Sequence, residues 1–128
     1  MGFFLINIYN NSLSFSPFFI ILLLWYPCFE NLFSIIRKNI SKTDPLKPDN
    51  NHLHQHLYIY IKNKFKFKDL LSNNLSSLII NTFNFFIFFI SFIDPENTKL
   101  QLSLILLCLF IYFISYQFLI KKNLLRKK

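Results

Sequence analysis

Residues 100–120 read LQLSLILLCLFIYFISYQFLI, and this stretch decides the fold of the chain. It contains no charged residue and only a few polar ones, spread along its length. A bilayer hydrocarbon core about 30 Å thick needs roughly 20 helical residues to cross it. The stretch therefore predicts a membrane-spanning helix over about residues 100–120.

Two further apolar blocks lie upstream of this stretch. Residues 17–36 read PFFIILLLWYPCFENLFSII, and residues 78–93 read LIINTFNFFIFFISFI. The second block is short, but Leu71 and Leu75 can extend it at the membrane interface. A chain of 128 residues is too small to bury three such helices on all sides in a soluble core. We therefore expect an all-α integral membrane protein with three transmembrane helices, at about 17–36, 77–93 and 100–120.

The amino-acid composition is biased, and this bias limits what the count of any one residue type indicates. The chain is 53% hydrophobic and 20% aromatic, has the single glycine Gly2, and contains no alanine or valine. Phe, Ile, Leu, Asn and Lys replace the missing types, which indicates strongly AT-biased coding. Many of the 18 phenylalanines are then simply the available apolar residue, whereas the length of the apolar blocks remains informative.

A fourth apolar piece, FFLINIY at residues 3–9, is too short to span a membrane. A signal peptide would begin with positive charge and end at a small-residue cleavage site, and neither is present. We interpret residues 3–9 as the clipped end of another membrane helix. On this interpretation the chain is the C-terminal part of a larger protein.

The distribution of positive charge predicts the orientation in the membrane. Of the 14 Lys and Arg residues, eight lie between Arg37 and Lys68, and five lie in the C-terminal tail. The connectors at residues 10–14 and 94–99 hold only Lys99. By the positive-inside rule, the segment 37–76 and the C-terminus are cytoplasmic. The net charge of +8 then reflects topology and attraction to anionic lipids rather than binding to nucleic acid.

A few residues inside the predicted helices invite a functional interpretation. Cys28 and Cys108 lie on different helices and form no CxxC pair, so they indicate neither a disulfide nor a zinc site. Glu30 lies near the cytoplasmic end of its helix, where it can pair with Arg37 or serve function directly. Pro27 predicts a kink in the same helix.

The segment 37–76 is the one substantial part outside the predicted spans. Pro45 and Pro48 indicate a loop at its start. Further on, the alternating lysines from Lys62 to Lys68 have the period of a strand, whereas Leu57, Ile61 and Phe65 share a helical face. We favour an interfacial helix over about 53–64, because an isolated strand at a membrane leaves its edges unpaired. The lysines would then lie at the level of the lipid headgroups, with a share in phosphate binding as the alternative.

The loop also carries every histidine of the chain, in PDNNHLHQH at residues 48–56. A transition-metal site is possible with this spacing, but no cysteine is near and Asp49 is the only close carboxylate. A pH switch is equally possible for any exposed histidine. A phosphate site has more context, because Arg37, Lys38, Lys42 and Lys47 lie on the approach to the motif.

The two segments WYPCFENLFSIIRK (25–38) and SKTDPLKPDNNHLHQHLY (41–58) together resemble the C-terminal part of a known family. The family is that of the bacterial polyprenyl-phosphate N-acetylhexosamine-1-phosphate transferases, which start lipid-linked sugar synthesis. Its pattern joins a YPxFExLFSxxRR helix end to a PDxxHLHQ loop. The matching residues are Tyr26, Pro27, Phe29, Glu30, Leu32, Phe33, Ser34 and Arg37 in the helix, and Pro45, Pro48, Asp49, His52, Leu53, His54 and Gln55 in the loop. SNNLSS at residues 72–77 resembles the NNLTS that opens the family's next membrane helix.

The resemblance implies a reaction at the bacterial inner membrane. A polyprenyl phosphate attacks the β-phosphate of a UDP-N-acetylamino sugar, UMP leaves, and Mg²⁺ is the usual metal. His52 and His54 would donate hydrogen bonds to the diphosphate as catalytic residues. Lys47, Asp49 and Gln55 would position the substrate, whereas His56 stands where the family often has an apolar residue.

The family's paired aspartates and its NxxNxxDGxDG loop have no counterpart in this sequence. Because magnesium needs oxygen ligands, histidines cannot replace those carboxylates. We therefore expect that this chain is inactive alone. The alternative is a small non-enzymatic membrane anchor or subunit that presents a basic cytoplasmic loop to lipids or to a partner.

Overall fold

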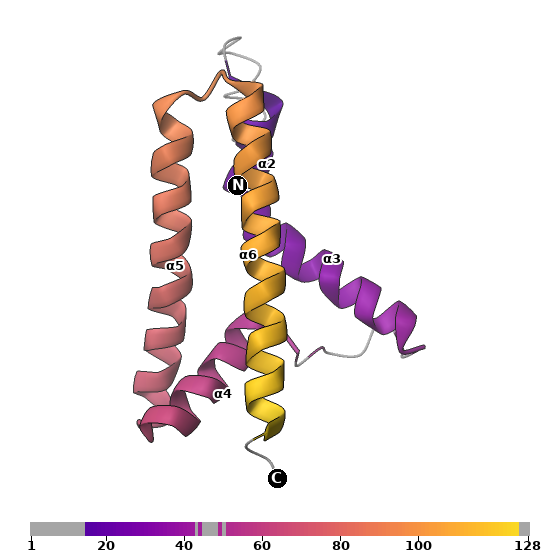
Figure 1. Cartoon of the computed structure of the whole chain (residues 1–128), viewed down its shortest axis with the longest axis vertical. Coiled ribbons are helices and arrows are strands. Elements are labelled where there is room, and N and C mark those ends of the chain that lie inside the picture. Colours follow the sequence, from indigo (N-terminus) through magenta and orange to yellow (C-terminus); the bar gives the residue numbers. More distant parts are fainter. Residues whose placement is uncertain (1–14, 43, 45–48, 50, 126–128) are drawn as a thin grey trace.

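The computed structural model describes residues 15–42, 44, 49 and 51–125, and all regular elements in this part of the chain are α-helices (Figure 1). The helices are α2 (Pro17–Leu23), α3 (Trp25–Ile40), α4 (Leu53–Phe65), α5 (Asp69–Ile93) and α6 (Thr98–Leu125). The expected all-α class is thus confirmed for the described residues. The clipped helix expected at residues 3–9 lies outside them.

Two helices, α5 and α6, are each long and apolar enough to cross a membrane, and α2 with α3 would make a third, bent span. Large side chains on α5 face outward, with Phe85 65% and Phe92 70% exposed, as lipid-facing residues would be. Both helices are longer than predicted, because polar residues such as those at the start of α5 continue a helix beyond its apolar stretch.

The first apolar block is not one straight helix. The axes of α2 and α3 differ by 73°, and Leu24 between them has a non-helical backbone (φ −107°, ψ 7°). Pro27 explains the break, because its ring clashes with the carbonyl four residues earlier and it has no N–H to donate. Placed in the first turn of α3, the same proline needs no intrahelical partner. The predicted kink is therefore confirmed. The bend is so large that residues 17–36 belong to two helices and not to the single predicted one.

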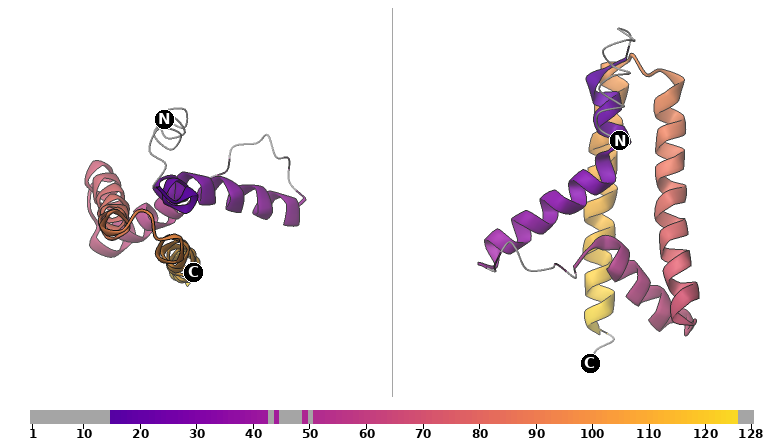
Figure 2. Two further views of the ribbon diagram at one scale, coloured as in Figure 1. Left: turned by 90° about the horizontal axis from the view of Figure 1, so that it is seen from above. Right: turned by 180° about the vertical axis from the view of Figure 1, so that it is seen from behind.

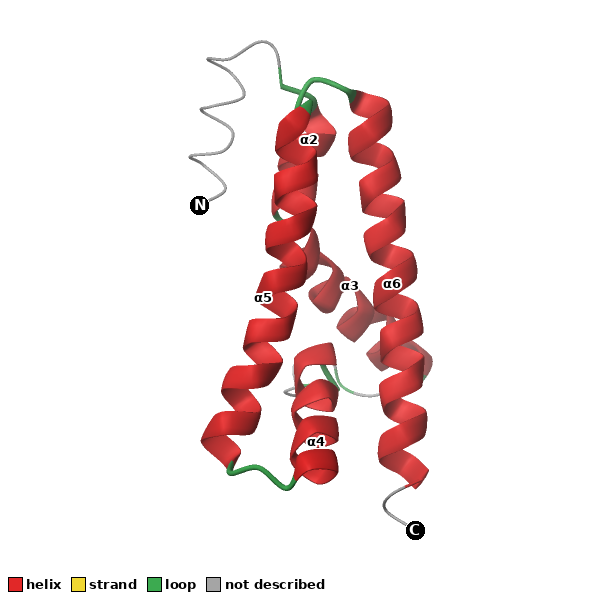
Figure 3. Cartoon of the chain, turned by 60° about the vertical axis from the view of Figure 1, so that its left-hand side comes forward, coloured by secondary structure: helices red, strands yellow, loops and turns green. Residues whose placement is uncertain are grey.

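The helices are arranged around α6. Figure 2 shows α2 beside the upper part of α6, and α3 leaving the bundle sideways. At the lower end α4 packs against α5 and α6 (Figure 3). Leu22, Trp25 and Leu53 pack from the other helices onto a buried row of α6. That row includes Cys108 and Tyr112. The thiols of Cys28 and Cys108 are both free, the first exposed and the second buried.

Helix α4 agrees with the predicted interfacial helix to within one residue. The residue that caps its C-terminus, Lys66, has the left-handed conformation (φ 54°) and donates its N–H to the carbonyl of Lys62 at 2.9 Å. Glycine usually fills this position at a helix end, but the only glycine of this chain is Gly2. An ion pair of 2.5 Å between Lys62 and Asp69 spans the turn into α5. The strand alternative for the alternating lysines is wrong.

A buried amide joins α5 to α6 at the other end. Gln101 Nε2 donates to the carbonyls of Ser91 (3.0 Å) and Asp94 (2.9 Å), and its Oε1 accepts from Ser91 Oγ at 2.5 Å. The N–H of Ser16 also donates to the carbonyl of Pro95 at 3.0 Å, which ties the start of α2 to this turn. In a medium without water, such internal partners determine how helices end.

We expect Gln101→Leu to destabilise the protein by about 1–2 kcal/mol, because it removes the hydrogen bonds of Gln101 to the buried Ser91 hydroxyl and carbonyl and to the Asp94 carbonyl. Reversible unfolding in mixed detergent micelles measures this change. Ser103→Ala is the matched control, since Ser103 bonds only the Leu100 carbonyl of its own helix. Equal stability of the two variants would contradict the assigned role of Gln101.

Candidate functional site

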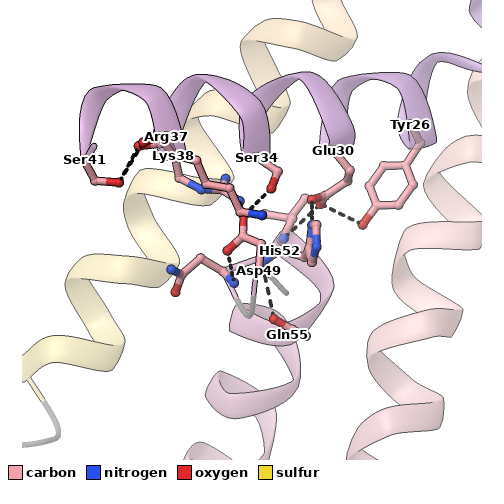
Figure 4. Close-up of polar contacts among 11 residues, drawn as sticks. Tyr26, Glu30, Ser34, Arg37, Lys38, Ser41, Asp49, His52 and Gln55 are labelled. Carbon is pink, nitrogen blue, oxygen red and sulfur yellow. Dashed lines mark hydrogen bonds and ion pairs between the residues drawn. The ribbon is translucent and has the colours of Figure 1, made fainter. Parts of the chain in front are cut away.

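One side of α3 carries a row of four polar side chains. Tyr26, Glu30, Ser34 and Arg37 follow one another at intervals of four, four and three residues, which places them on one helical face. Figure 4 shows this face turned toward the segment that precedes and opens α4. The row thus meets the histidine-containing loop.

Glu30 is the centre of the contact. Its side chain is 8% exposed, and its carboxylate accepts three hydrogen bonds. Tyr26 Oη donates to Oε1 at 3.1 Å, the backbone N–H of Leu53 donates to Oε1 at 2.9 Å, and His52 Nδ1 lies 2.8 Å from Oε2. A buried carboxylate needs such partners, because an unpaired charge would be costly to desolvate.

The contact of Glu30 with Leu53 also caps α4. Leu53 is the first residue of that helix, so its N–H has no intrahelical acceptor. A carboxylate at this end also interacts favourably with the positive end of the helix dipole. Gln55 adds a local contact, accepting the N–H of His52 at 3.4 Å. The start of α4 is therefore fixed by a residue of α3 that is 23 positions earlier.

Asp49 forms the second contact between the loop and α3. Its Oδ2 accepts from Ser34 Oγ at 2.6 Å and from Arg37 Nη2 at 2.5 Å, while Oδ1 accepts the N–H of Asn51 at 2.9 Å. Burial alone would raise the pKa of Asp49, but the hydrogen bonds from Ser34 and Arg37 outweigh it and lower the pKa to about 2. Asp49 is therefore ionised at neutral pH and neutralises Arg37.

The three histidines have three different environments. The ring of His52 contacts Glu30, and the exposed ring of His54 stacks on it with centroids 5.6 Å apart. The ring of His56 packs edge-on against Tyr116 at 5.4 Å, and its buried Nε2 has no partner among the described residues. Burial, and then the charge of Arg37, lower the pKa of His56, so it is neutral at pH 7.

The predicted site residues are thus placed as follows. His54 and Gln55 line a groove between α4 and α5 with Tyr58, Asp69 and Asn73. His52 and Asp49 lie against α3, whereas Lys47 is outside the described residues. The expected pairing of Glu30 with Arg37 is wrong, because Arg37 pairs with Asp49 and Glu30 with His52.

Two members of the site, Tyr26 and Ser34, were not predicted as site residues. Their signal is present in the sequence, since four polar side chains at intervals of four, four and three in an apolar block must face something polar. Tyr26 bonds Glu30 of its own helix, but the partner of Ser34 lies 15 residues away, which periodicity alone cannot reveal.

The carboxylates present do not fit a magnesium site. Within the described residues, no three His, Cys, Asp or Glu side chains are grouped so that they could hold a metal ion. Glu30 and Asp49 are each occupied by hydrogen-bond donors, and Asp69, which lines the groove with His54, is paired with Lys62. The oxygen ligands that Mg²⁺ requires are not assembled by this part of the chain.

An apolar cavity of about 210 Å³ adjoins the polar contacts. Tyr26 and Leu53 line it and also touch Glu30, while Phe83 of α5 and Tyr112 of α6 form other parts of its wall. A polar cluster beside an apolar cavity suits an amphiphile, with its charged group at the cluster and its chain in the cavity.

Comparison with known proteins adds nothing to this geometry. No family model, no curated protein and no solved structure matches the chain.

The low pKa of Asp49 predicts a dependence of stability on pH. Because the folded pKa of about 2 lies below the ordinary value of 3.8, the contribution of Asp49 is present above pH 4 and is lost as the pH falls through 2. A ¹³C NMR titration of the Asp49 carboxyl carbon should give a midpoint near pH 2. Asp49→Asn should destabilise the protein by about 2 kcal/mol at pH 7, whereas the exposed control Glu96→Gln should not. A midpoint near 4 would contradict the pairing.

The contact of Glu30 with His52 predicts a tautomer. A carboxylate accepts hydrogen bonds, so Nδ1 of His52 is expected to carry a proton that it donates to Glu30 Oε2. ¹⁵N NMR of histidine-labelled protein distinguishes the two ring nitrogens. Glu30→Leu should move the proton of His52 toward Nε2 and remove the cap of α4, at a cost of about 1–2 kcal/mol. Glu30→Gln should retain the cap, because its Oε1 can still accept from Leu53 and Tyr26, but its Nε2 then donates to Nδ1 of His52 and should also move the proton to Nε2. His54 should be unchanged in both variants.

Proposed function

We propose that this chain forms the histidine-bearing part of a membrane enzyme that transfers an N-acetylamino-sugar 1-phosphate from a UDP-sugar to a polyprenyl phosphate. The observation that carries the proposal is the meeting of the two motif segments. Glu30 contacts His52 and Leu53, and Ser34 and Arg37 contact Asp49. Polar residues of the YPxFE helix and of the PDxxHLHQ loop are thus direct partners.

Because the YPxFE helix and the PDxxHLHQ loop are in contact, their side chains suit the binding of a diphosphate. His52 and His54 stack on each other at the start of α4, and the ring of His54 is exposed. Arg37 is paired with Asp49 through Nη2, but its Nε and Nη1 have no hydrogen-bond partner among the described residues and can serve as further donors. Donors of this kind stabilise the charge that develops on phosphate oxygens during phosphoryl transfer.

Helix α3 also places these polar contacts next to the apolar cavity, which suits a lipid chain. The apolar cavity shares Tyr26 and Leu53 with the cluster around Glu30, so a lipid phosphate at the cluster could extend its chain into the cavity. In the proposed reaction, an oxygen of the lipid phosphate attacks the sugar-bearing phosphorus, and UMP leaves. The chain's own residues bind and orient the two phosphorylated substrates.

The metal-binding part of the enzyme must come from elsewhere. The sequence has only six carboxylates, and Glu30 and Asp49, which contact the histidine loop, are occupied by hydrogen-bond donors. The proposal therefore includes a polypeptide outside these 128 residues that supplies the magnesium ligands. It also places segment 37–76 on the cytoplasmic side of a bacterial inner membrane, where UDP-sugars are made.

The test is a UMP-release assay with Mg²⁺, UDP-N-acetylglucosamine and undecaprenyl phosphate in proteoliposomes. The chain alone should give no turnover. Fused behind the aspartate-bearing helices of an active family member, residues 17–128 should support turnover, and His54→Ala should lower it by roughly 100-fold. Asn63→Ala, an exposed change on the same helix, should have no effect.

Two outcomes would contradict the proposal. Turnover by the chain alone would show that the missing carboxylates are unnecessary. A fusion that folds but is unaffected by His54→Ala would favour the alternative of a non-enzymatic anchor with a basic loop.

A further inference from the structure

Two lysines and two aromatic rings join α4 to α6 near the C-terminal ends of both helices. The ring of Tyr60 on α4 packs against the ring of Phe118 on α6, with centroids 6.1 Å apart. Lys64 Nζ lies 5.4 Å from the ring centroid of Tyr60, and Lys122 Nζ lies 5.8 Å from that of Phe118. We call these four residues the lysine–aromatic row. Two lysines from different helices thus flank one pair of rings.

The positive charge of the row is not neutralised by the described part of the chain. Helices α4, α5 and α6 contain a single carboxylate, Asp69, and it forms its ion pair with Lys62. Lys64 and Lys122 are exposed, and neither has an ion-pair partner among the described residues. Contact with the rings stabilises a cation but leaves its charge in place. The row therefore suits an anion.

Exposed apolar side chains continue from the row along α6. Ile114, Phe118 and Lys122 follow one another at intervals of four residues, which places them on one side of the helix. The side chains of Ile114 and Phe118 are both half-exposed. This side of α6 therefore has a cation at its end and apolar surface next to it, which is the order of groups that an anionic amphiphile would match.

The row also lies where the surface of a membrane would be. Helices α5 and α6 are long and apolar enough to cross a membrane, and the start of α5 and the end of α6 lie at the same end of the bundle (Figure 1). The apolar run of α6 ends at Ile120, just before Lys122. A lysine in this position keeps its stem beside apolar side chains and extends its ammonium group to the headgroup phosphates.

We propose that the lysine–aromatic row binds an anionic phospholipid of the bilayer. Its phosphate lies between Lys64 and Lys122, and an acyl chain lies along Phe118 and Ile114. Basic sites between membrane helices bind anionic headgroups in this way, and the flexible ammonium groups of two lysines can both turn toward one phosphate. An acidic protein segment would match the charge of the row but not the exposed apolar side of α6.

The phospholipid site does not rest on the proposed function. Its residues are neither those assigned to the diphosphate nor those that line the apolar cavity. A negative result for the row would therefore leave the transferase proposal as it stands, and the reverse is also true.

The test is native mass spectrometry of the full-length chain in detergent, titrated with dioleoylphosphatidylglycerol or with dioleoylphosphatidylcholine. The two lipids share their acyl chains and differ in headgroup charge. The wild-type chain should bind the anionic lipid at least tenfold more tightly. Lys64→Gln/Lys122→Gln should abolish this preference, because each lysine near a headgroup contributes about a fivefold change in affinity. Both side chains are exposed, so the variant should fold like the wild type.

Lys66→Gln/Lys68→Gln is the matched control. It removes the same charge from exposed lysines of the turn after α4, outside the row. It should keep the preference within about threefold of the wild type, since the remaining effect is that of long-range attraction. Equal losses in the two double variants would overturn the proposal, because the attraction would then belong to the overall basic charge.

Competition distinguishes a bilayer phospholipid from other sources of phosphate. Millimolar inorganic phosphate should not displace the bound phosphatidylglycerol, because it has no acyl chain. Displacement by inorganic phosphate, or no preference of the wild-type chain for the anionic lipid, would overturn the proposal. Displacement by undecaprenyl phosphate at a tenfold lower concentration would do the same, and would indicate that the row binds the lipid substrate of the proposed reaction.

Discussion

The buried carboxylate of Glu30 is the constraint on which the arrangement of this chain depends. It receives donors from its own helix, from the histidine loop and from the first residue of α4. Because a carboxylate in this environment is stable only when such donors are present, the contacts favour one another and form together. Their formation fixes the point at which α4 begins, and α4 in turn packs against both α5 and α6.

The fold shows which features follow from local sequence. The uninterrupted apolar run of 100–120 was enough to predict α6, since its length matches a bilayer and its composition excludes exposure to water. The sharing of one face by Leu57, Ile61 and Phe65 similarly gave α4. The sequence did not reveal how far α3 turns near Pro27, because its direction also depends on tertiary contacts such as those of Phe33 with Tyr112 and Tyr116 of α6.

The candidate site was predictable in its residues and not in its contacts. The motif identified the histidines and Asp49 as candidate site residues. The pairing of Glu30 with Arg37 was expected because the two residues are close along one helix. Ion pairs that close across 12 and 22 residues depend on where the loop returns, and nothing local in the loop encodes that path. The polar row of α3 indicated that some polar surface must cover it. The identity of that surface required the tertiary structure.

The bend at Leu24 has a mechanical consequence. Helix α3 has 16 residues and is therefore about 24 Å long, and it leaves the bundle from a single non-helical residue. A rotation of about 10° around that residue would move the far end of α3 by about 4 Å. Because Glu30 and Arg37 contact the loop at two points along α3, a change of the angle at Leu24 would move the loop together with the helix.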